Sequence, residues 1–326
     1  MSEKLLEVED LEVSFATEDG LVRAVGGVSF TLSRGETVAI VGESGSGKSV
    51  TVMTLMGLTR SPNSRFAGAA RLHGVDLIGA SEDKLEAIRG KEIAMIFQDP
   101  ISALSPVYRV GAQIAEQIRA HEKISKAAAL ERAVDLMGRV GIPNARQRAR
   151  AYPHEFSGGM RQRVMIAMAL SLSPSVLIAD EPTTALDVTI QAQILALLAE
   201  LRSKFGLAML FISHDLAVVS QVADRVAVMY AGSIVELGSK HEIFHAPAHP
   251  YTRGLLHSVP DLKTNRSQPL GTIEGTVPPL HSLPPGCAFE PRCGFRVAEC
   301  ARVFPALEEV APAHWARCPV VNPKYK

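Results

Sequence analysis

The sequence predicts an α/β protein built on a parallel β-sheet that is buried on both faces, followed by a small irregular C-terminal segment. Strand, helix and strand patterns alternate over residues 176–179, 189–204 and 207–213, and this rhythm is typical of parallel strands that share one sheet. After about residue 240 proline becomes frequent and the regular periodicity fades. We therefore expect a domain boundary near residue 238.

Length and composition narrow the class of protein. The chain has 326 residues, of which 47% are hydrophobic, enough for about two domains with ordinary cores. Lys plus Arg and Asp plus Glu number 34 each, so no net charge attracts nucleic acid or anionic lipid. There is neither an apolar run of about 18 residues nor an apolar signal core near Met1. We expect a cytosolic protein that binds no nucleic acid and reaches a membrane only through a partner.

Strands are expected wherever short apolar or alternating runs occur. Residues 5–15 and 25–32 alternate apolar and polar side chains, and Glu18, Asp19 and Gly20 between them are typical of a hairpin turn. A last hairpin is expected to turn at Ala231 and Gly232. The remaining predicted strands cover residues 38–41, 69–72, 93–97, 225–230 and 233–236.

Helices are expected mainly between residues 100 and 170, where the sequence is Ala-rich and has a helical period. Gly141 and Pro143 end the second helix of this region. Elsewhere Ser81 is a suitable N-cap for a helix. The predicted helices cover residues 50–58, 81–89, 112–120, 126–140, 164–172 and 252–257.

A glycine-rich loop between the strand at 38–41 and the helix at 50–58 has the pattern Gly-x-x-x-x-Gly-Lys-Ser. Its backbone N–H groups can converge on a phosphate, and the following helix start adds its positive dipole end. Lys48 would reach the β- and γ-phosphates, and the Ser49 hydroxyl would ligate Mg²⁺. The alternative, a flexible loop without a ligand, is disfavoured by the flanking strand and helix. The predicted ATP-binding residues here are Gly42, Ser44, Gly45, Ser46, Gly47, Lys48, Ser49 and Val50.

Two carboxylates follow the strand at 176–179, and a phosphate-binding site with Mg²⁺ needs carboxylates at such a position. Asp180 would hold Mg²⁺ directly or through water, and Glu181 would polarise the attacking water as general base. The alternative for Asp-Glu-Pro is a simple turn at the end of a strand, and the glycine-rich loop upstream argues against it.

A set of further motifs gives the chain its family resemblance. Ser157, Gly158 and Gly159 precede an apolar helix, with Gln162 three residues on. Gln98 follows one strand, Ala185-Leu186-Asp187 follows the acidic pair, and Ser213-His214-Asp215 follows another strand. Over residues 5–238 the sequence therefore resembles the ATP-binding-cassette family. The resemblance implies a RecA-like parallel sheet core with an antiparallel β subdomain and a helical subdomain at about residues 100–170. The implied domains are a nucleotide-binding domain at 1–238 and an extension at 239–326.

The resemblance also implies roles for these residues. Two cassettes pair head to tail, so that Ser157, Gly158, Gly159 and Gln162 face the partner's ATP. His214 assists Glu181 at the γ-phosphate, and Asp187 couples the two sites. Gln98 senses Mg²⁺, which it holds together with Ser49 and Asp180. By position Phe15 is the aromatic that stacks on adenine, although phenylalanine is also an ordinary strand residue.

An importer is favoured over a soluble cassette, because the chain has one cassette, no coiled coil and no basic patch. In importers the surface after Gln98 receives a cytoplasmic helix of the membrane permease. Here residues 99–108 mix apolar and small side chains, which suits helix-in-groove docking. Leu104 and Val107 are the expected contacts, and a buried loop is the alternative.

Residues 249–256, His-Pro-Tyr-Thr-Arg-Gly-Leu-Leu, are similar to the start of the extension in ATPases of oligopeptide, dipeptide and nickel importers. Residues 232–238 and 98–100 fit the same group. Such systems combine two ATPases, two permeases and an external binding protein. The resemblance implies a second ATPase subunit, a paralogue or a second copy of this chain, at the cytoplasmic face of the membrane. Peptide is the expected cargo, with nickel or another solute as the alternative.

All four cysteines, Cys287, Cys293, Cys300 and Cys318, lie in the last forty residues. A cytosolic setting argues against disulfides, and a segment with little core favours a metal site. The C-x2-C pairs usual for zinc are missing. In the importer group a similar pattern holds an iron–sulfur cluster, so the resemblance implies a structural [4Fe–4S] cluster, with Zn²⁺ or unligated thiols as alternatives.

Overall fold

The structure is a computed structural model that describes residues 3–18, 20–184, 186–258 and 271–322. The chain divides into two compact units, which we describe separately. Unit 1 comprises Met1–Leu5, Leu32–Glu36 and Gly79–Leu210, and unit 2 comprises Leu6–Thr31, Thr37–Ile78 and Phe211–Lys326. The predicted hairpin residue Asp19 and the motif residue Ala185 lie outside the described residues. The boundary expected near residue 238 stays a prediction.

The main sheet combines a parallel centre with antiparallel additions, which confirms the predicted α/β class. In unit 2 its strand order is β11-β12-β10-β9-β3-β8, and in unit 1 it is β8-β7-β6, because β8 belongs partly to each unit. β3 is parallel to β9, and β6 is parallel to β7. The strands are β3 (Thr37–Val41), β6 (Ile93–Ile96), β7 (Val176–Asp180), β8 (Ala208–Ser213), β9 (Arg225–Tyr230), β10 (Ser233–Ser239), β11 (Glu308–Ala311) and β12 (His314–Ala316).

The central strands are buried along their whole length. Every residue of β3, β7 and β8 is buried, as expected for strands with helices on both faces. Their carboxyl ends lead into the glycine-rich loop, the acidic pair and His214. The sheet thus presents the predicted chemistry at strand ends, where open α/β sheets bind their ligands.

A second sheet has the order β2-β1-β4-β5. β1 pairs antiparallel with β4, so that Leu6 lies opposite Leu72 and Phe15 opposite Ser64. This is the antiparallel part that the family resemblance implies. Its strands are β1 (Lys4–Thr17), β2 (Gly20–Ser33), β4 (Ser64–Leu72) and β5 (Val75–Asp76).

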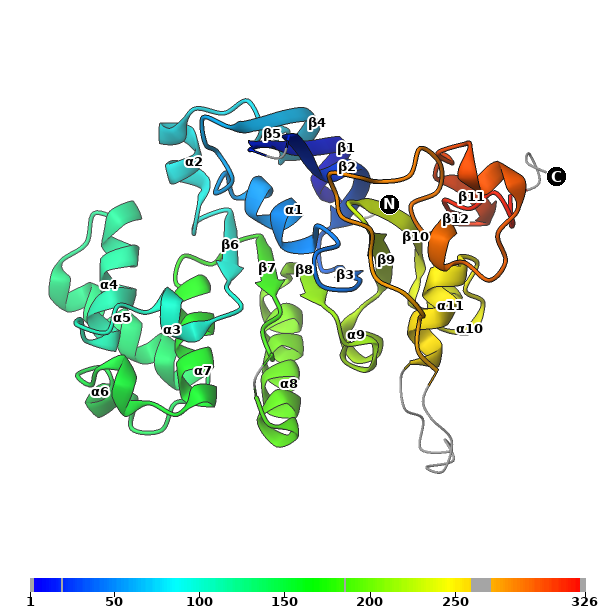
Figure 1. Ribbon diagram of the computed structural model, residues 1–326. Coiled ribbons are helices and arrows are strands. Elements are labelled where there is room, and N and C mark those ends of the chain that lie inside the picture. The colour runs from blue at the N-terminus through cyan, green and yellow to red at the C-terminus, as the bar shows by residue number, and fades with distance from the viewer. Residues whose placement is uncertain (1–2, 19, 185, 259–270, 323–326) are drawn as a thin grey trace. The chain divides into compact units, whose positions relative to one another are not determined.

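The helical part of unit 1 forms a cluster in which α4, α5 and α7 contact one another (Figure 1). Apolar side chains at helical spacing are buried, among them Ile114 and Ile118 of α4 and Ala129, Ala133 and Met137 of α5. These helices match the predicted ranges closely. The cluster contains α3 (Pro100–Ala103), α4 (Val110–His121), α5 (Lys126–Arg139), α6 (Ala145–Arg148), the 3-10 turn η1 (Pro153–Glu155) and α7 (Gly158–Ala169).

Two helices differ from their predicted bounds for local reasons. α7 begins six residues before the predicted start at 164, because the Ser157 hydroxyl caps it by accepting from the Met160 N–H. α1 (Lys48–Leu55) ends before residue 58, because Gly57 takes a positive φ of 68° and stops the helix. The other helices are α2 (Glu82–Ile88), α8 (Val188–Phe205) and α9 (Leu216–Val222).

The C-terminal extension is more ordered than its sequence suggests. It contributes α10 (Lys240–His245), α11 (Pro250–His257), the 3-10 turns η2 (Glu290–Arg292) and η3 (Ala298–Ala301), and strands β11 and β12. β12 pairs with β10, so the extension continues the main sheet of unit 2 (Figure 1). The prediction missed these strands because three or four residues are too few to show a period.

Glu236 of β10 joins the extension to the sheet. Its side chain is fully buried and accepts from the N–H groups of Ala248 (2.7 Å) and His249 (2.9 Å). It also bonds to His314 Nε2 of β12 at 2.7 Å. A buried carboxylate with three partners is costly to remove, because each partner would be left unsatisfied.

The buried ring of His249 is expected to make the fold acid-sensitive. Its Nδ1 accepts from the Tyr251 N–H, and burial lowers its pKa from 6.5 to about 3. The unfolded chain therefore binds a proton at a higher pH than the folded chain. Stability is expected to be complete above pH 6.5 and to fall as the pH drops toward 3, by at most about 1.4 kcal/mol per unit for this one proton.

His249→Asn tests this expectation, because asparagine keeps an acceptor at the helix N-cap but does not titrate. Urea unfolding measured between pH 7 and pH 4 should give a shallower pH dependence for the variant than for the wild type. Equal slopes would contradict a role for His249.

Candidate nucleotide-binding and hydrolysis site

The glycine-rich loop at residues 42–49 runs from β3 into α1 and needs glycine at two close approaches. Gly42 has φ 157°, and a Cβ there would lie 2.1 Å from the Met229 oxygen. Gly47 has φ 99°, and a Cβ there would lie 2.5 Å from the Ala24 oxygen. Any other residue would collide with backbone at these points. The loop is therefore held closely against its neighbours in unit 2.

Lys48 points back into the loop. Its Nζ donates to the carbonyl oxygens of Gly42 (2.8 Å) and Glu43 (2.9 Å), and the residue is 5% exposed. Ser46 is buried with it, whereas Ser44 and Gly45 are exposed at the tip, and Ser49 and Val50 of α1 are half-buried. The loop thus holds its ammonium group in place before any phosphate arrives.

The acidic pair lies where β7 ends. Asp180 is the last residue of the strand and is 2% exposed. Glu181 follows with φ 46°, an uncommon value for a residue with a side chain. Backbone strain of this kind concentrates at functional sites, in agreement with separate roles for the two acids.

Unit 1 brings Gln98 and Glu181 together. Gln98 lies two residues beyond β6, which pairs with β7 in register from Ile93 to Ile96. Gln98 Nε2 donates to Glu181 Oε2 at 2.9 Å, and Thr184 Oγ1 donates to the same oxygen at 2.9 Å. Thr184 was not predicted as a site residue, although its position three residues after Glu181 could have indicated a contact between the two side chains. Two donors thus fix the orientation of the glutamate that we expect to act as base.

The residues expected to face a partner's nucleotide lie at the N-terminal end of α7. Ser157 caps the helix, and Gly158 and Gly159 form its exposed to half-buried first turn. Gln162 differs, because it is only 2% exposed and its Nε2 has no hydrogen-bond partner among the described residues. To contact a nucleotide directly, the side chain would have to leave the interior, and the assignment of Gln162 to the partner's ATP stays a prediction.

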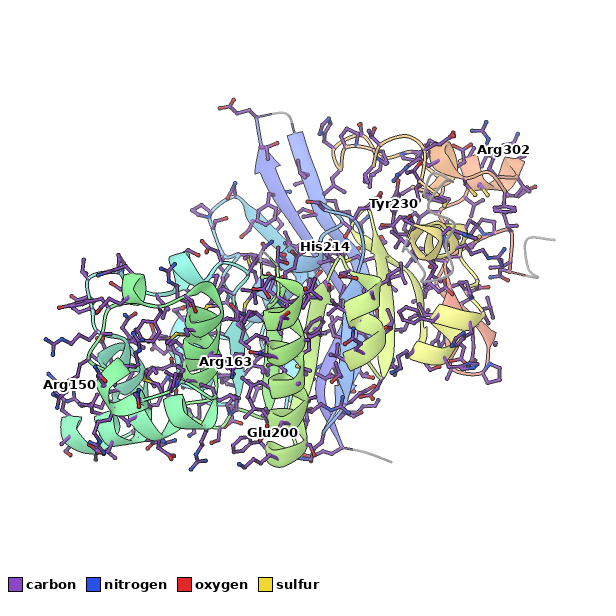
Figure 2. All side chains as sticks on the ribbon, turned by 90° about the horizontal axis from the view of Figure 1, so that it is seen from below. Arg150, Arg163, Glu200, His214, Tyr230 and Arg302 are labelled. Carbon is purple, nitrogen blue, oxygen red and sulfur yellow. The ribbon has the colours of Figure 1, made fainter. Side chains whose placement is uncertain are left out.

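Asp187 and His214 occupy helix-starting loops in different units. Asp187 caps α8 by accepting from the Ile190 N–H at 2.9 Å. His214 is exposed between β8 and α9 (Figure 2). Its neighbour Asp215 caps α9 through the N–H groups of Ala217 and Val218. A helix cap explains the type of residue at 187 and 215.

Phe15 lies near the end of β1 and is half-buried. Half-burial is compatible with stacking on a base and equally with an ordinary place in the sheet. The assignment of Phe15 to adenine stays a prediction.

The four cysteine thiols are unpaired, and three of them are buried (Cys287, Cys300 and Cys318). Burial raises the pKa of Cys287 to about 11 and also raises the pKa values of Cys293 and Cys318, with the other cysteines adding smaller effects. Across the described ranges, no three His, Cys, Asp or Glu side chains are arranged so that they could hold a metal ion. The structure therefore does not support the iron–sulfur or zinc site expected from the sequence.

Magnesium has a different requirement from a cluster. It is usually held by one or two carboxylates together with substrate phosphates, so a dedicated group of three acidic side chains is not needed. Asp180, Gln98 and Ser49 offer the oxygen donors that Mg²⁺ prefers. These residues fit the ion by their chemistry.

A phosphate-binding loop after a buried parallel strand, with an acidic pair ending another, defines a P-loop nucleoside triphosphatase. Comparison with known proteins refines this class. Residues 25–184 match the model of the ABC transporter family, and residues 235–300 match that of the oligopeptide/dipeptide transporter C-terminal region.

Curated relatives match nearly the whole chain. The oligopeptide transport ATP-binding protein OppD of Bacillus subtilis is 52% identical, with 98% of this chain and 90% of the relative covered. The dipeptide transport ATP-binding protein DppD of the same organism is 51% identical, with 97% and 94% covered. OppD of Salmonella typhimurium is 51% identical, with 96% and 93% covered.

Solved structures agree in fold. The bacterial ABC transporter cassette MJ0796, solved as a dimer, has a TM-score of 0.65 at 24% identity, with 72% of this chain and 98% of that chain covered. CbiO1 of Clostridium perfringens has a TM-score of 0.62 at 29% identity, with 75% and 92% covered.

The chain belongs to the ABC transporter ATP-binding proteins of the oligopeptide/dipeptide group. It is an ATPase that couples ATP hydrolysis to transport. In the portion of the chain that the structure describes, no helix has the length and apolar character needed to cross a bilayer.

Proposed function

We propose that this ATPase drives the uptake of dipeptides or oligopeptides through a membrane importer. The observation that carries the proposal is the match of residues 235–300 to the transporter C-terminal region. Relatives that match across almost the whole chain are named for oligopeptide and dipeptide transport. The cargo is bound by other subunits, so it is inferred from these similarities rather than from a pocket in this chain.

In the proposed mechanism the chain's own residues bind and orient ATP. Residues 42–50 surround the phosphates, and Lys48 exchanges its contacts with loop carbonyls for contacts with phosphate oxygens. Ser49, Asp180 and Gln98 would hold Mg²⁺, which would supply positive charge to the β- and γ-phosphates. Glu181 removes a proton from the attacking water, while His214 holds that water and the γ-phosphate in line.

Transport requires that hydrolysis change the shape of an assembly. We propose that two ATPase subunits close on ATP, with the first turn of α7 facing the partner's nucleotide and Asp187 joining the two sites. Exposed N–H groups at a helix N-terminus favour a γ-phosphate, and Ser157, Gly158 and Gly159 provide such a helix start. The second subunit is a paralogue or another copy of this chain.

The proposed permease contact is the loop after α3. Gln113 fixes this loop, because its Nε2 donates to the carbonyl oxygens of Ser105 and Tyr108 and its Oε1 accepts from the Ser105 N–H. The loop displays Val107 (71% exposed) and Tyr108 (60% exposed), whereas Leu104 is 2% exposed. Val107 and Tyr108, but not Leu104, are therefore available to a partner.

A groove beside this loop supports the same proposal. A pocket of about 540 Å³ is lined by Tyr108, Arg109 and side chains of α4, α5 and α6. The lining combines apolar and charged side chains, which suits an amphipathic helix. We propose that a cytoplasmic helix of one permease docks here and that the second permease docks on the partner ATPase. This contact would hold the chain peripherally at the cytoplasmic face of the membrane.

Uptake into vesicles tests the proposal. Vesicles that contain the cognate permeases, this ATPase with its partner subunit and the external binding protein should accumulate a labelled dipeptide or oligopeptide only with ATP. Lys48→Ala should abolish accumulation, because the loop then lacks its phosphate-binding ammonium group. If the vesicles accumulate nickel instead of peptide, nickel is the cargo. If they accumulate no solute although the ATPase is active, the importer function is refuted.

A cofactor for the cysteines is a separate, sequence-based proposal. Its support is that all four thiols lie in one segment and that the other three interact electrostatically with Cys287. Protein purified without oxygen should then contain iron and acid-labile sulfide, and Cys300→Ser should lose both. Zinc without iron would indicate a structural zinc site. Four freely alkylated thiols in a folded, metal-free protein would refute any metal site.

A further inference from the structure

Glu43, the second residue of the phosphate-binding loop, is held by two side chains of the C-terminal extension. Tyr251 accepts a hydrogen bond from the Glu43 N–H, and Arg292 forms an ion pair with the Glu43 carboxylate. These residues are more than 200 positions from Glu43 in the sequence, with separations of 208 and 249 residues, yet all three belong to unit 2. The extension therefore contacts both the backbone and the side chain of Glu43.

The Tyr251 contact is rigid. The hydroxyl oxygen lies 2.9 Å from the Glu43 nitrogen, and the tyrosine is fully buried. Its ring lies 4.6 Å from that of Tyr230 at the end of β9 (Figure 2) and 5.4 Å from that of Phe289, measured between centroids. Burial raises the pKa of the Tyr251 phenol well above its usual value, so the hydroxyl stays protonated at neutral pH. The aromatic cluster fixes the position of the acceptor.

The Arg292 contact is bidentate. Nη1 lies 2.7 Å from Glu43 Oε2 and Nη2 lies 3.2 Å from Glu43 Oε1. The Arg292 side chain is 5% exposed, and its remaining donors reach the carbonyl oxygens of Ile273 (3.2 Å) and Glu274 (2.9 Å). Nη1 also lies 3.5 Å from the Tyr230 hydroxyl. The Glu43 side chain is 31% exposed, so the pair is half-buried, and its fork shape gives it a more defined geometry than a single contact would. Arg292 thus sets the position of the Glu43 side chain.

Glu43 in turn holds the lysine that binds phosphate. Its carbonyl oxygen accepts from Lys48 Nζ at 2.9 Å, next to the contact from the same nitrogen to the Gly42 oxygen. A displacement of Glu43 would therefore move a ligand of the ammonium group as well as the loop backbone. A misplacement of about 1 Å in a binding site can cost on the order of a hundredfold in rate. A continuous series of contacts through Glu43 therefore connects the extension to Lys48.

We infer that the C-terminal extension positions the phosphate-binding loop through Glu43, and that Tyr251 and Arg292 are positioning residues for ATP binding. The inference rests on nucleotide binding by residues 42–49. In this inference the extension contributes to ATP binding as well as to any role it has in assembly of the transporter. Arg292 lies in the turn between Cys287 and Cys293, which is closed by bonds from the Glu290 N–H to the Cys287 oxygen and from the Cys293 N–H to the Glu290 oxygen.

Conservative variants test the inference by the dissociation constant of MgATP, measured by calorimetry on the full chain. Tyr251→Phe keeps the aromatic cluster and removes only the acceptor, and should weaken binding about threefold to tenfold. Arg292→Met should weaken it at least about tenfold, and Arg292→Lys should recover part of the loss because it keeps the charge without the fork. In a Glu43→Gln background, Arg292→Met should have little further effect, since the pair is already broken.

Arg71→Met is the control. Arg71 of β4 forms an exposed ion pair with Glu9 at 2.7 Å, and its loss should leave MgATP affinity unchanged. Lys48→Ala gives the reference for a disabled loop. Melting temperatures of all variants are measured with and without nucleotide.

Two results would overturn the inference. One is an unchanged dissociation constant in folded Tyr251→Phe and Arg292→Met. The other is a lower melting temperature with unchanged affinity, which would make the contacts purely structural. A wild-type protein that fails to bind MgATP would instead refute the nucleotide function itself, so the two failures are distinguishable.

Discussion

Glu181→Gln is expected to stop ATP turnover while leaving ATP binding intact. The carboxylate is the proposed general base, and removing such a group typically costs about 10²–10⁴ in rate. The amide has the same length and can still accept from Gln98 Nε2 or Thr184 Oγ1, which both donate to Glu181 Oε2 in the wild type. The variant should therefore fold normally and accumulate in the closed, ATP-bound dimer.

Steady-state hydrolysis, MgATP affinity and the fraction of dimer measured by light scattering check this prediction together. The matched control is Glu200→Gln, an exposed residue on α8 (Figure 2) that undergoes the same chemical change without a proposed role. It should hydrolyse ATP like the wild type. Near-normal hydrolysis by Glu181→Gln would mean that another group is the base.

Local motifs could be predicted from the sequence because their physics is local. The glycine-rich loop and the acidic pair each depend on residues within a few positions of one another, and each follows the expected strand. The prediction of a parallel sheet is confirmed for the same reason, since the fully buried runs of β3, β7 and β8 are visible in the sequence.

Long-range contacts could not be predicted. Nothing near Glu43 indicates that Arg292, 249 residues away, forms its ion pair. The same holds for Glu236, whose partner His314 lies on a strand of three residues. The predicted helix at 252–257 begins earlier in the structure, because His249 caps α11 and Pro250 is its first residue. The additional role of Tyr251 depends on which loop the helix meets, which the local sequence does not encode.

The burial of individual apolar side chains could not be predicted from the sequence either. Leu104 and Val107 looked equivalent as apolar residues of one loop, but Leu104 is 2% exposed and Val107 is 71% exposed. A charge at Leu104 would enter the interior of the helical cluster and destabilise it. A charge at Val107 would stay in water. Only Val107 can therefore separate docking from folding.

Val107→Asp is expected to abolish the association of the ATPase with membranes that contain its permeases. In a docked complex the carboxylate would replace an apolar contact and lose its hydration, which should weaken binding at least about tenfold. The free protein should keep its melting temperature and its MgATP affinity, because Val107 is exposed and the loop is fixed by Gln113.

Co-sedimentation with permease-containing vesicles measures the effect, with vesicles lacking permease as the blank. Leu21→Asp is the matched control, since Leu21 of β2 is an apolar residue 53% exposed outside the proposed contact. It should sediment like the wild type. If Val107→Asp also sediments like the wild type, the permease binds elsewhere on the chain. Of the two sites, only the Val107 loop borders the groove lined by Tyr108 and α4, α5 and α6. If both variants lose association, the added charge itself weakens binding, and the result does not identify a specific docking surface.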